Sequence, residues 1–93
     1  MTAYAIVTLT ITNPGMFDNY RAQAGAALEK HGITALNVSK SPQQLEGSAD
    51  LPELIVLLTA DSADDFHAWH IDPELGHIHD MRRASGDVSL MLM

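Results

Sequence analysis

The segment 53–60 reads ELIVLLTA and carries apolar side chains at both odd and even positions. Successive side chains of a β-strand point to opposite faces of its sheet, so both faces of this strand would be apolar. Such a strand is typical of a sheet that is covered on both faces. Each face of the sheet therefore needs a cover. One face would carry Leu54, Val56 and Leu58, and the other would carry Ile55 and Leu57.

The remaining elements follow from periodicity and from helix-boundary signals. Asn13-Pro14 is typical of an N-cap followed by proline at the first helical position, and Gly32 is typical of a helix end. Ser62 begins a second helical segment with Asp65 three residues later, and Asp72-Pro73 breaks that segment. Gly86-Asp87 is expected to form a turn. The predicted strands are 3–12, 33–40, 53–60 and 88–93, and the predicted helices are 14–31 and 62–84.

This order, β-α-β-β-α-β, is the pattern of a ferredoxin-like sandwich. It predicts an α+β fold in which a four-stranded antiparallel sheet carries both helices on one face, with right-handed crossovers. With 93 residues, the chain is expected to form one domain, residues 1–93.

Two helices can cover only one face of this sheet, although strands 3–12, 53–60 and 88–93 are apolar on both. Each large side chain left in water would forgo about 1.5–3 kcal/mol of burial free energy. We therefore expect a homodimer in which two sheets pack face to face. The alternative is a monomer whose polar connection 41–52 folds over the sheet; that connection could also serve as a lid.

Charge and hydropathy exclude several classes of partner. The net charge of −7 argues against binding to nucleic acid or to an anionic membrane. The N-terminal segment alternates and lacks a basic region, so it reads as a strand and not as a signal peptide. No apolar run is long enough to span a bilayer, so a cytoplasmic location is expected. No phosphate loop or nucleotide fingerprint is present, and no cofactor is expected.

Five stretches in this order and spacing resemble the domain-of-unknown-function family 1330: AYAIVTLTITNP, FDNYRAQAGAALEKHG, LEG, LIVLLTADSADDFHAWHIDPEL and RRASGD. That family belongs to the dimeric α+β-barrel superfamily. The resemblance covers nearly the whole chain and implies a ferredoxin-like dimer whose two sheets form a barrel. Relatives in the superfamily include cofactor-independent monooxygenases, isomerases and proteins that only bind ligands. The family itself has no settled activity, so the resemblance implies a scaffold and no reaction.

The resemblance can be followed at individual positions. Tyr20-Arg21, Glu46-Gly47, Trp69 and Arg82 match recurrent residues of the family. Other positions depart from it, so the family's ligand need not be the ligand of this chain. His31, His70 and Leu75 stand where tyrosines are usual, only Gly32 remains of a glycine pair, and Ser39-Lys40 replaces an Arg-Gly pattern.

Four of the five histidines lie between Ser62 and Ala84, which raises the question of a metal site. His77 and His79 are two residues apart, a spacing that points helical side chains away from each other. No HExxH motif is present, so no metal is expected. We expect His67, His77 and His79 to be solvated, and His70 to face inward with Phe66 and Trp69.

Arg82 falls four residues after Ile78 and seven after Leu75, so it shares their inward face. A buried guanidinium needs a partner, either a carboxylate such as Glu46 or a bound anion. The first hypothesis is a cavity for a small aromatic or carboxylate-bearing ligand, with His70 as acid or base and Arg82 as oxyanion stabiliser if catalysis occurs. The second is a non-catalytic dimeric module in which these residues are structural. The candidate ligand-binding residues are Tyr20, Glu46, Trp69, His70 and Arg82.

Overall fold

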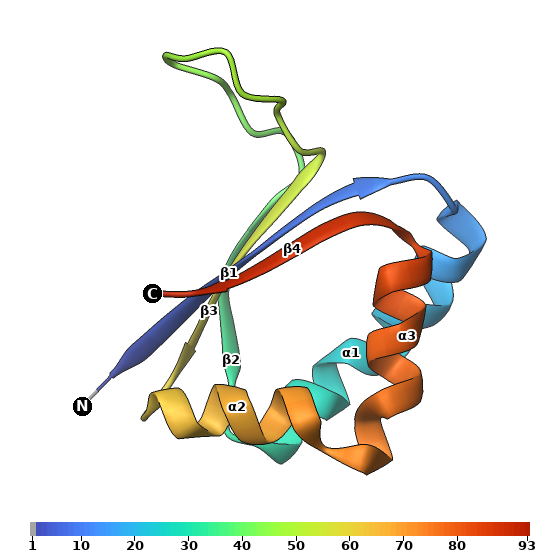
Figure 1. The fold of residues 1–93 in the computed structure, drawn as a ribbon, viewed down its shortest axis with the longest axis vertical. Coiled ribbons are helices and arrows are strands. Elements are labelled where there is room, and N and C mark those ends of the chain that lie inside the picture. Colours follow the sequence, from blue (N-terminus) through green and yellow to red (C-terminus); the bar gives the residue numbers. More distant parts are fainter. Residues whose placement is uncertain (1) are drawn as a thin grey trace.

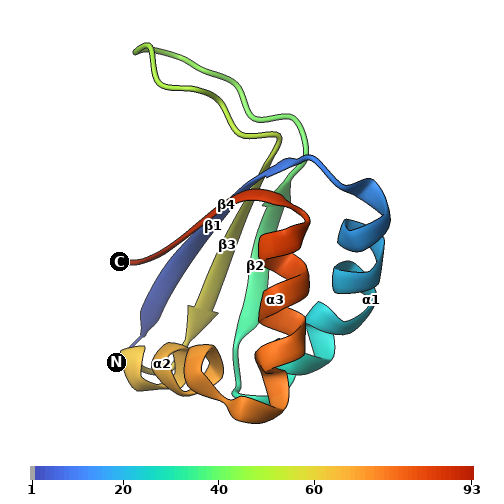
Figure 2. The ribbon, with the colours of Figure 1, turned by 45° about the vertical axis from the view of Figure 1, so that its right-hand side comes forward.

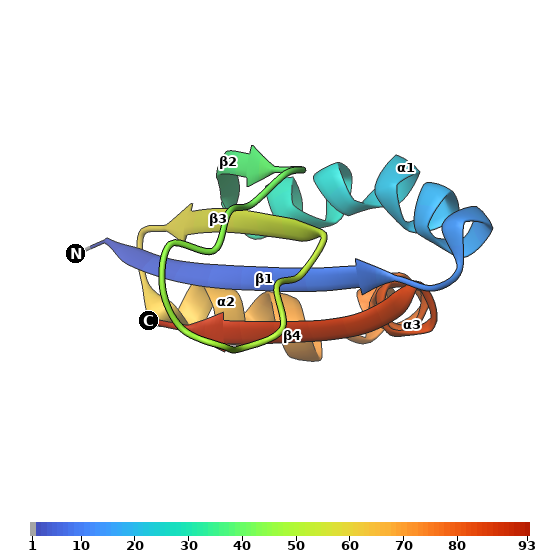
Figure 3. The same ribbon diagram turned by 90° about the horizontal axis from the view of Figure 1, so that it is seen from above.

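The computed structural model describes residues 2–93. Its four strands form one sheet in the order β2-β3-β1-β4, with every neighbouring pair antiparallel, and Figure 3 shows the strands in this order. All helices lie on one face of the sheet (Figure 1), which confirms the predicted architecture. The elements are β1 (Ala3–Ile11), α1 (Pro14–Lys30), β2 (Thr34–Ser39), β3 (Leu54–Ala60), α2 (Ala63–Ile71), the 3₁₀ turn η1 (Pro73–Leu75), α3 (Gly76–Ala84) and β4 (Gly86–Leu92).

The helix boundaries follow the predicted signals. The Asn13 side chain accepts a hydrogen bond from the Met16 N–H at 3.1 Å, and Gly32 adopts φ +68° just after α1. Asp65 accepts a bond from the Ser62 N–H at 3.3 Å. At the predicted break, the Asp72 carboxylate accepts a bond from the Glu74 N–H at 2.9 Å, and the chain turns from α2 into α3 (Figure 2).

The predicted turn at Gly86-Asp87 is wrong, because both residues belong to β4. Gly86 pairs with Ile11 and Asp87 with Thr10. A Cβ at position 86 would collide with the backbone carbonyl of Thr10, so the glycine permits close strand pairing and does not mark a turn. The chain passes from α3 into β4 at Ser85, whose carbonyl accepts bonds from the N–H groups of residues 12 and 13.

The core lies between the helices and the face of the sheet that they cover. Ala5, Val7 and Leu9 of β1 alternate inward and are at most 8% exposed. Leu58 of β3 is 2% exposed on the same face. The helices contribute Phe66, Trp69, Leu75 and Ile78 to this core.

The opposite face of the sheet is covered by no element of residues 2–93 (Figure 1). We call it the open face. Ile6 lies there beside Leu57 and Met91, and Met91 is 50% exposed. The segment 40–53 projects beyond the end of the sheet, away from the helices (Figures 1 and 2), with Leu45 94% exposed. The monomer alternative, in which this segment folds over the sheet, is therefore not the arrangement found. Among the described residues, no helix is long and apolar enough to cross a membrane.

Candidate functional site

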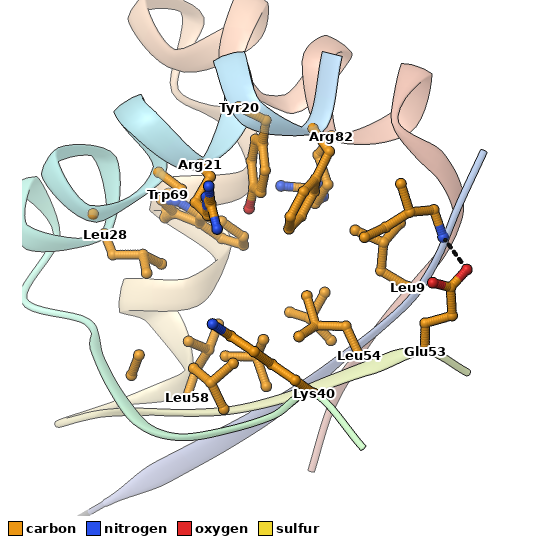
Figure 4. A pocket seen from close by; sticks show the side chains of 18 residues that line it. Leu9, Tyr20, Arg21, Leu28, Lys40, Glu53, Leu54, Leu58, Trp69 and Arg82 are labelled. Atoms are coloured by element: carbon orange, nitrogen blue, oxygen red, sulfur yellow. Dashed lines mark hydrogen bonds between the residues drawn. The ribbon is translucent and has the colours of Figure 1, made fainter. Parts of the chain in front are cut away.

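A cavity of about 660 Å³ lies between α1 and the covered face of the sheet. It exists because α1 packs mainly against α3 and stands away from the strands. Figure 4 shows side chains entering it from the helices on one side and from the sheet on the other. The lining residues are Val7, Leu9, Ile11, Phe17, Tyr20, Arg21, Ala24, Gly25, Leu28, Ala35, Val38, Lys40, Glu53, Leu54, Val56, Leu58, Trp69 and Arg82.

Three of the chain's five basic residues line this mostly aliphatic cavity: Arg21, Lys40 and Arg82. Arg21 and Lys40 are exposed at its rim, whereas Arg82 is 2% exposed at its inner end. Glu53 is the single carboxylate of the lining, and it lies at the rim, accepting a hydrogen bond from the Ile11 N–H at 3.1 Å. The cavity is therefore biased toward positive charge in a chain whose net charge is −7.

Trp69 of α2 and Arg82 of α3 form the inner end, and His79 of α3 contacts both without lining the cavity. We call these three side chains the buried cluster. The Arg82 guanidinium carbon lies 5.3 Å from the centre of the Trp69 ring, within the range of a cation–π contact. The rings of Trp69 and His79 meet edge to face at 4.7 Å. All three residues are at most 3% exposed.

The bonds of His79 fix its protonation state. Its Nε2 lies 2.9 Å from the Trp69 carbonyl oxygen, which can only accept, so Nε2 carries the hydrogen. Its Nδ1 lies 2.7 Å from Nη1 of Arg82, which can only donate, so Nδ1 accepts. Burial lowers the pKa of His79 below its ordinary value, and the Arg82 charge adds to this while the bond to Trp69 opposes it. His79 is therefore a neutral imidazole that holds Arg82.

Two N–H groups of the buried cluster have no hydrogen-bond partner among residues 2–93. They are Nε1 of Trp69 and Nε of Arg82, and both atoms are buried. Most buried polar groups in native proteins are hydrogen-bonded, so two buried donors without an acceptor, both on residues that line one cavity, require an explanation. Both atoms have almost no accessible surface, so an acceptor in the cavity reaches them only when the side chains over them shift.

The structure brings together three of the five predicted site residues. Tyr20, Trp69 and Arg82 line the cavity, and the Tyr20 hydroxyl points into it (Figure 4). Glu46 is exposed in the projecting segment 40–53 and does not reach Arg82, so the expected Arg82–Glu46 pair is not formed. None of residues 41–52 lines the cavity, so the lid expectation gains no support from the arrangement found.

The prediction that His70 faces inward is wrong, because the residue is exposed and does not line the cavity. His70 directly follows Trp69, so its side chain is rotated about 100° around the axis of α2, away from the buried face that Trp69 occupies. The His70 ring lies 5.7 Å from the His79 ring. Partial burial lowers the pKa of His70, with the Arg82 charge acting in the same direction.

The prediction that His79 is solvated is also wrong, since His79 is 2% exposed. A signal for its role was present, because His79 and Arg82 are three residues apart on one helix and therefore neighbours on its surface. Lys40 and Glu53 were missed as well; they flank the connection 41–52 and are placed at the rim only by the pairing of β2 with β3. Among residues 2–93 no three side chains of ligating type converge on a metal position, and the expected absence of a metal stays a prediction.

A second group of polar side chains joins the end of α1 to the break between α2 and η1. We call Lys30, His31, Asp72 and Glu74 the surface cluster. Lys30 Nζ lies 2.7 Å from carboxylate oxygens of both Asp72 and Glu74, and His31 Nε2 lies 2.8 Å from Asp72 Oδ2. The bonds from Lys30 and His31 hold the pKa of Asp72 well below its ordinary range.

Solved structures of other proteins share this fold over nearly the whole chain. A protein of unknown function from Rhodopseudomonas palustris has a TM-score of 0.83 at 13% identity, over 99% of this chain and 80% of its own. SnoaB, a cofactor-independent oxygenase from Streptomyces nogalater, has a TM-score of 0.73 at 13% identity, over 99% of this chain and 90% of its own. A dimeric ferredoxin-like protein of unknown function from Jannaschia sp. CCS1 has a TM-score of 0.65 at 18% identity, over 100% of this chain and 98% of its own. At these identities the likeness shows the fold alone, and it confirms the ferredoxin-like α+β class.

No curated protein matches the chain. The model of the family described as "Domain of unknown function (DUF1330)" matches residues 2–93. This match confirms the resemblance that the sequence motifs indicate. The chain belongs to the DUF1330 family.

Proposed function

We propose that the chain, as one domain of residues 1–93, binds a small carboxylate-bearing molecule with an aromatic or aliphatic body in the cavity beneath α1. The observation that carries this proposal is the buried guanidinium of Arg82, which lines an apolar cavity with no carboxylate partner among residues 2–93. A buried charge is costly unless it is paired and hydrogen-bonded. Trp69 and His79 contact this cation, but neither supplies a negative charge.

The rest of the cavity suits the same class of molecule. Its volume lies within the range of about 300–1,000 Å³ that is usual for small-molecule sites. The walls are aliphatic and aromatic, so they fit an apolar body. The rim cations Arg21 and Lys40 would raise the local concentration of an anion and favour its entry.

A thermal-shift screen of benzoate, phenylacetate and hexanoate, each paired with its neutral amide, tests the proposal. The variant is Arg82→Met, and the matched control is Arg83→Met, because Arg83 pairs with Asp80 on the exposed side of α3 at 3.1 Å. At least one acid should raise the melting temperature of wild type and of the control, and should do so far less for Arg82→Met. No rise with any acid on wild type, or an equal rise in all three proteins, would contradict the proposal.

The proposal includes a homodimer formed through the open face. Ile6, Leu57 and Met91 lie side by side there, and a structure with the same fold is described as dimeric. Sedimentation of wild type should give twice the chain mass, and Leu57→Asp should give a monomer or an unfolded chain. The control is Ile71→Asp, since Ile71 is 75% exposed on the helical layer and should leave the mass unchanged. A folded, monomeric wild type would overturn this part.

Catalysis in the same cavity is the alternative function. The likeness of the fold to a cofactor-independent oxygenase favours it, and Arg82 is placed where it could stabilise an oxyanion. His70 lies outside the cavity, so the lining side chains that could act as acid or base are Tyr20, Lys40 and Glu53. Mass spectrometry of each bound acid after long incubation in air separates the two functions, because a binding protein returns the acid unchanged. A non-catalytic structural dimer would show neither binding nor turnover. The cytoplasmic location stays a prediction.

A further inference from the structure

The inner end of the cavity differs from its aliphatic walls because it contains hydrogen-bond donors. It presents two buried N–H donors, Nε1 of Trp69 and Nε of Arg82, that find no acceptor among the described residues 2–93. Both side chains line the cavity, and both residues are at most 3% exposed. A buried donor left without a partner is costly, and more so where the group is charged. Both donors lie under the wall of the cavity, and an acceptor reaches them when neighbouring side chains shift as a molecule binds.

We infer that the Trp69 Nε1–H and the Arg82 Nε–H bind the carboxylate of the ligand, which enters the cavity carboxylate first. This inference rests on the proposed function and adds the recognising atoms and the orientation of the bound molecule. The body of the acid then lies along the aliphatic walls formed by residues such as Val56 and Leu58, with its far end at the rim.

The chemistry of the two donors selects for a charged oxygen. An indole N–H and a guanidinium N–H can only donate, so neither can bind a group that has no acceptor. Hydrogen bonds to an ionised acceptor are about twice as strong as bonds between neutral groups. A carboxylate also neutralises the Arg82 cation, which a neutral amide of the same shape does not do.

His79 acts in this site as a positioning residue. Its Nδ1 accepts from Arg82 Nη1 at 2.7 Å, and its Nε2–H donates to the Trp69 carbonyl at 2.9 Å. One neutral imidazole therefore ties the guanidinium to the backbone of the tryptophan and fixes both donors relative to each other. A flexible guanidinium would have to be ordered when the acid binds, and this ordering would lower the affinity of the protein for the acid.

The single tryptophan makes the inference directly measurable. Trp69 is the only tryptophan of the chain, so ¹⁵N-labelled protein gives one indole N–H resonance. Titration with benzoate should move the indole proton downfield to a saturating value, whereas benzamide should move it much less. The methyl resonances of the cavity leucines and valines report binding of either molecule wherever it sits. Both readouts use the wild-type protein and do not depend on the folding of a variant.

Variants extend the test to the roles of the three residues. Trp69→Phe and Arg82→Gln should each weaken benzoate binding by roughly 10- to 100-fold, while changing the affinity for benzamide little. His79→Leu should weaken benzoate selectively, and His79→Gln should restore part of the affinity, because an amide side chain can both donate and accept. A merely structural role for His79 would weaken benzoate and benzamide alike.

The outcomes separate this inference from the proposed function. If benzoate moves the methyl resonances while the indole proton stays in place, and Trp69→Phe binds as well as wild type, the inference is overturned and the cavity still binds acids. If neither benzoate nor any other acid of the thermal-shift screen moves methyl or indole resonances, the proposed function fails and this inference fails with it. A saturating indole shift that Arg82→Gln weakens supports both.

Discussion

The surface cluster and the buried cluster are made of similar parts in opposite surroundings. Each joins two helical segments through one histidine and one basic residue. In the surface cluster, Lys30 and His31 meet two carboxylates, Asp72 and Glu74. In the buried cluster, His79 and Arg82 meet the ring and the carbonyl of Trp69, and no carboxylate of residues 2–93.

The difference shows which cluster has a charge and hydrogen-bond donors available for a ligand. The surface cluster is satisfied by its own acids, is exposed to solvent in part, and fastens the end of α1 to the break after α2. The buried cluster keeps one positive charge and two unpaired N–H groups beside the cavity. Interactions of this kind weigh heavily in a dry interior and little at the surface. The following predictions test that contrast, from the largest expected effect to the smallest.

Among changes in the two clusters, replacing His79 with leucine should cause the largest loss of stability. The change leaves the Trp69 carbonyl without its donor and Arg82 Nη1 without its acceptor, both in a buried position. We expect the free energy of unfolding in urea to fall by about 2–5 kcal/mol. His31→Leu is the control, because Lys30 still neutralises Asp72 there, and its loss should be clearly smaller. Equal losses would show that burial does not distinguish the clusters.

Arg82→Met should destabilise the unliganded protein by only about 1–2 kcal/mol, because the lost bond to His79 is offset by the removal of a buried cation. Urea unfolding measures this change. A buried pair between Arg82 and a carboxylate would instead cost about 3–5 kcal/mol when broken. A loss of that size would show that an acid of the assembled protein meets Arg82, and would weaken the case for a ligand anion.

The two clusters should also differ in the pH range over which they affect the free energy of unfolding. The folded state holds the pKa of His79 below its ordinary value, so below about pH 6.5 the unfolded chain binds more protons and stability falls as the pH falls. The groups that act on the pKa of His79 are Trp69 and His70 of α2 and the charges of Arg82 and Arg83 of α3, and His70 contributes with the same sign. Urea unfolding at pH 7.5 and 5.5 should show a smaller loss for His79→Gln than for wild type. An identical loss in both proteins would assign the effect elsewhere.

The surface cluster should respond in a different and more acidic window. Since the pKa of Asp72 is held low in the folded state, its contribution is present above the ordinary aspartate value of about 4 and declines below it. Asp72→Asn should therefore differ from wild type slightly at pH 7, and this difference should shrink in acid and in high salt. Thermal unfolding at low and high salt measures it. A difference that persists in 1 M salt would contradict the view that solvent screens this cluster.

Local periodicity was enough to predict the order of the elements and the inward positions of Trp69 and Arg82. Those positions repeat with the helical period beside apolar neighbours, and burial of an apolar stripe rotates a helix in the same way in almost any context. The caps at Asn13 and Asp72 were readable for a similar reason, because a cap bonds to backbone groups only two or three residues away. The two apolar faces of 53–60 were likewise visible in the sequence.

The sequence by itself thus determined the sheet, its helical cover, and the apolar stripe that each helix turns inward, because each of these depends on residues close together in the chain. Tertiary structure alone decided that His79 is buried and His70 exposed, that Arg82 meets His79 and not Glu46, and that Gly86 serves strand pairing. The fate of the two histidines depends on the angle between α2 and α3 after the break at Pro73. That angle is set by how both helices pack on the sheet and on α1, and no local pattern of residues encodes it.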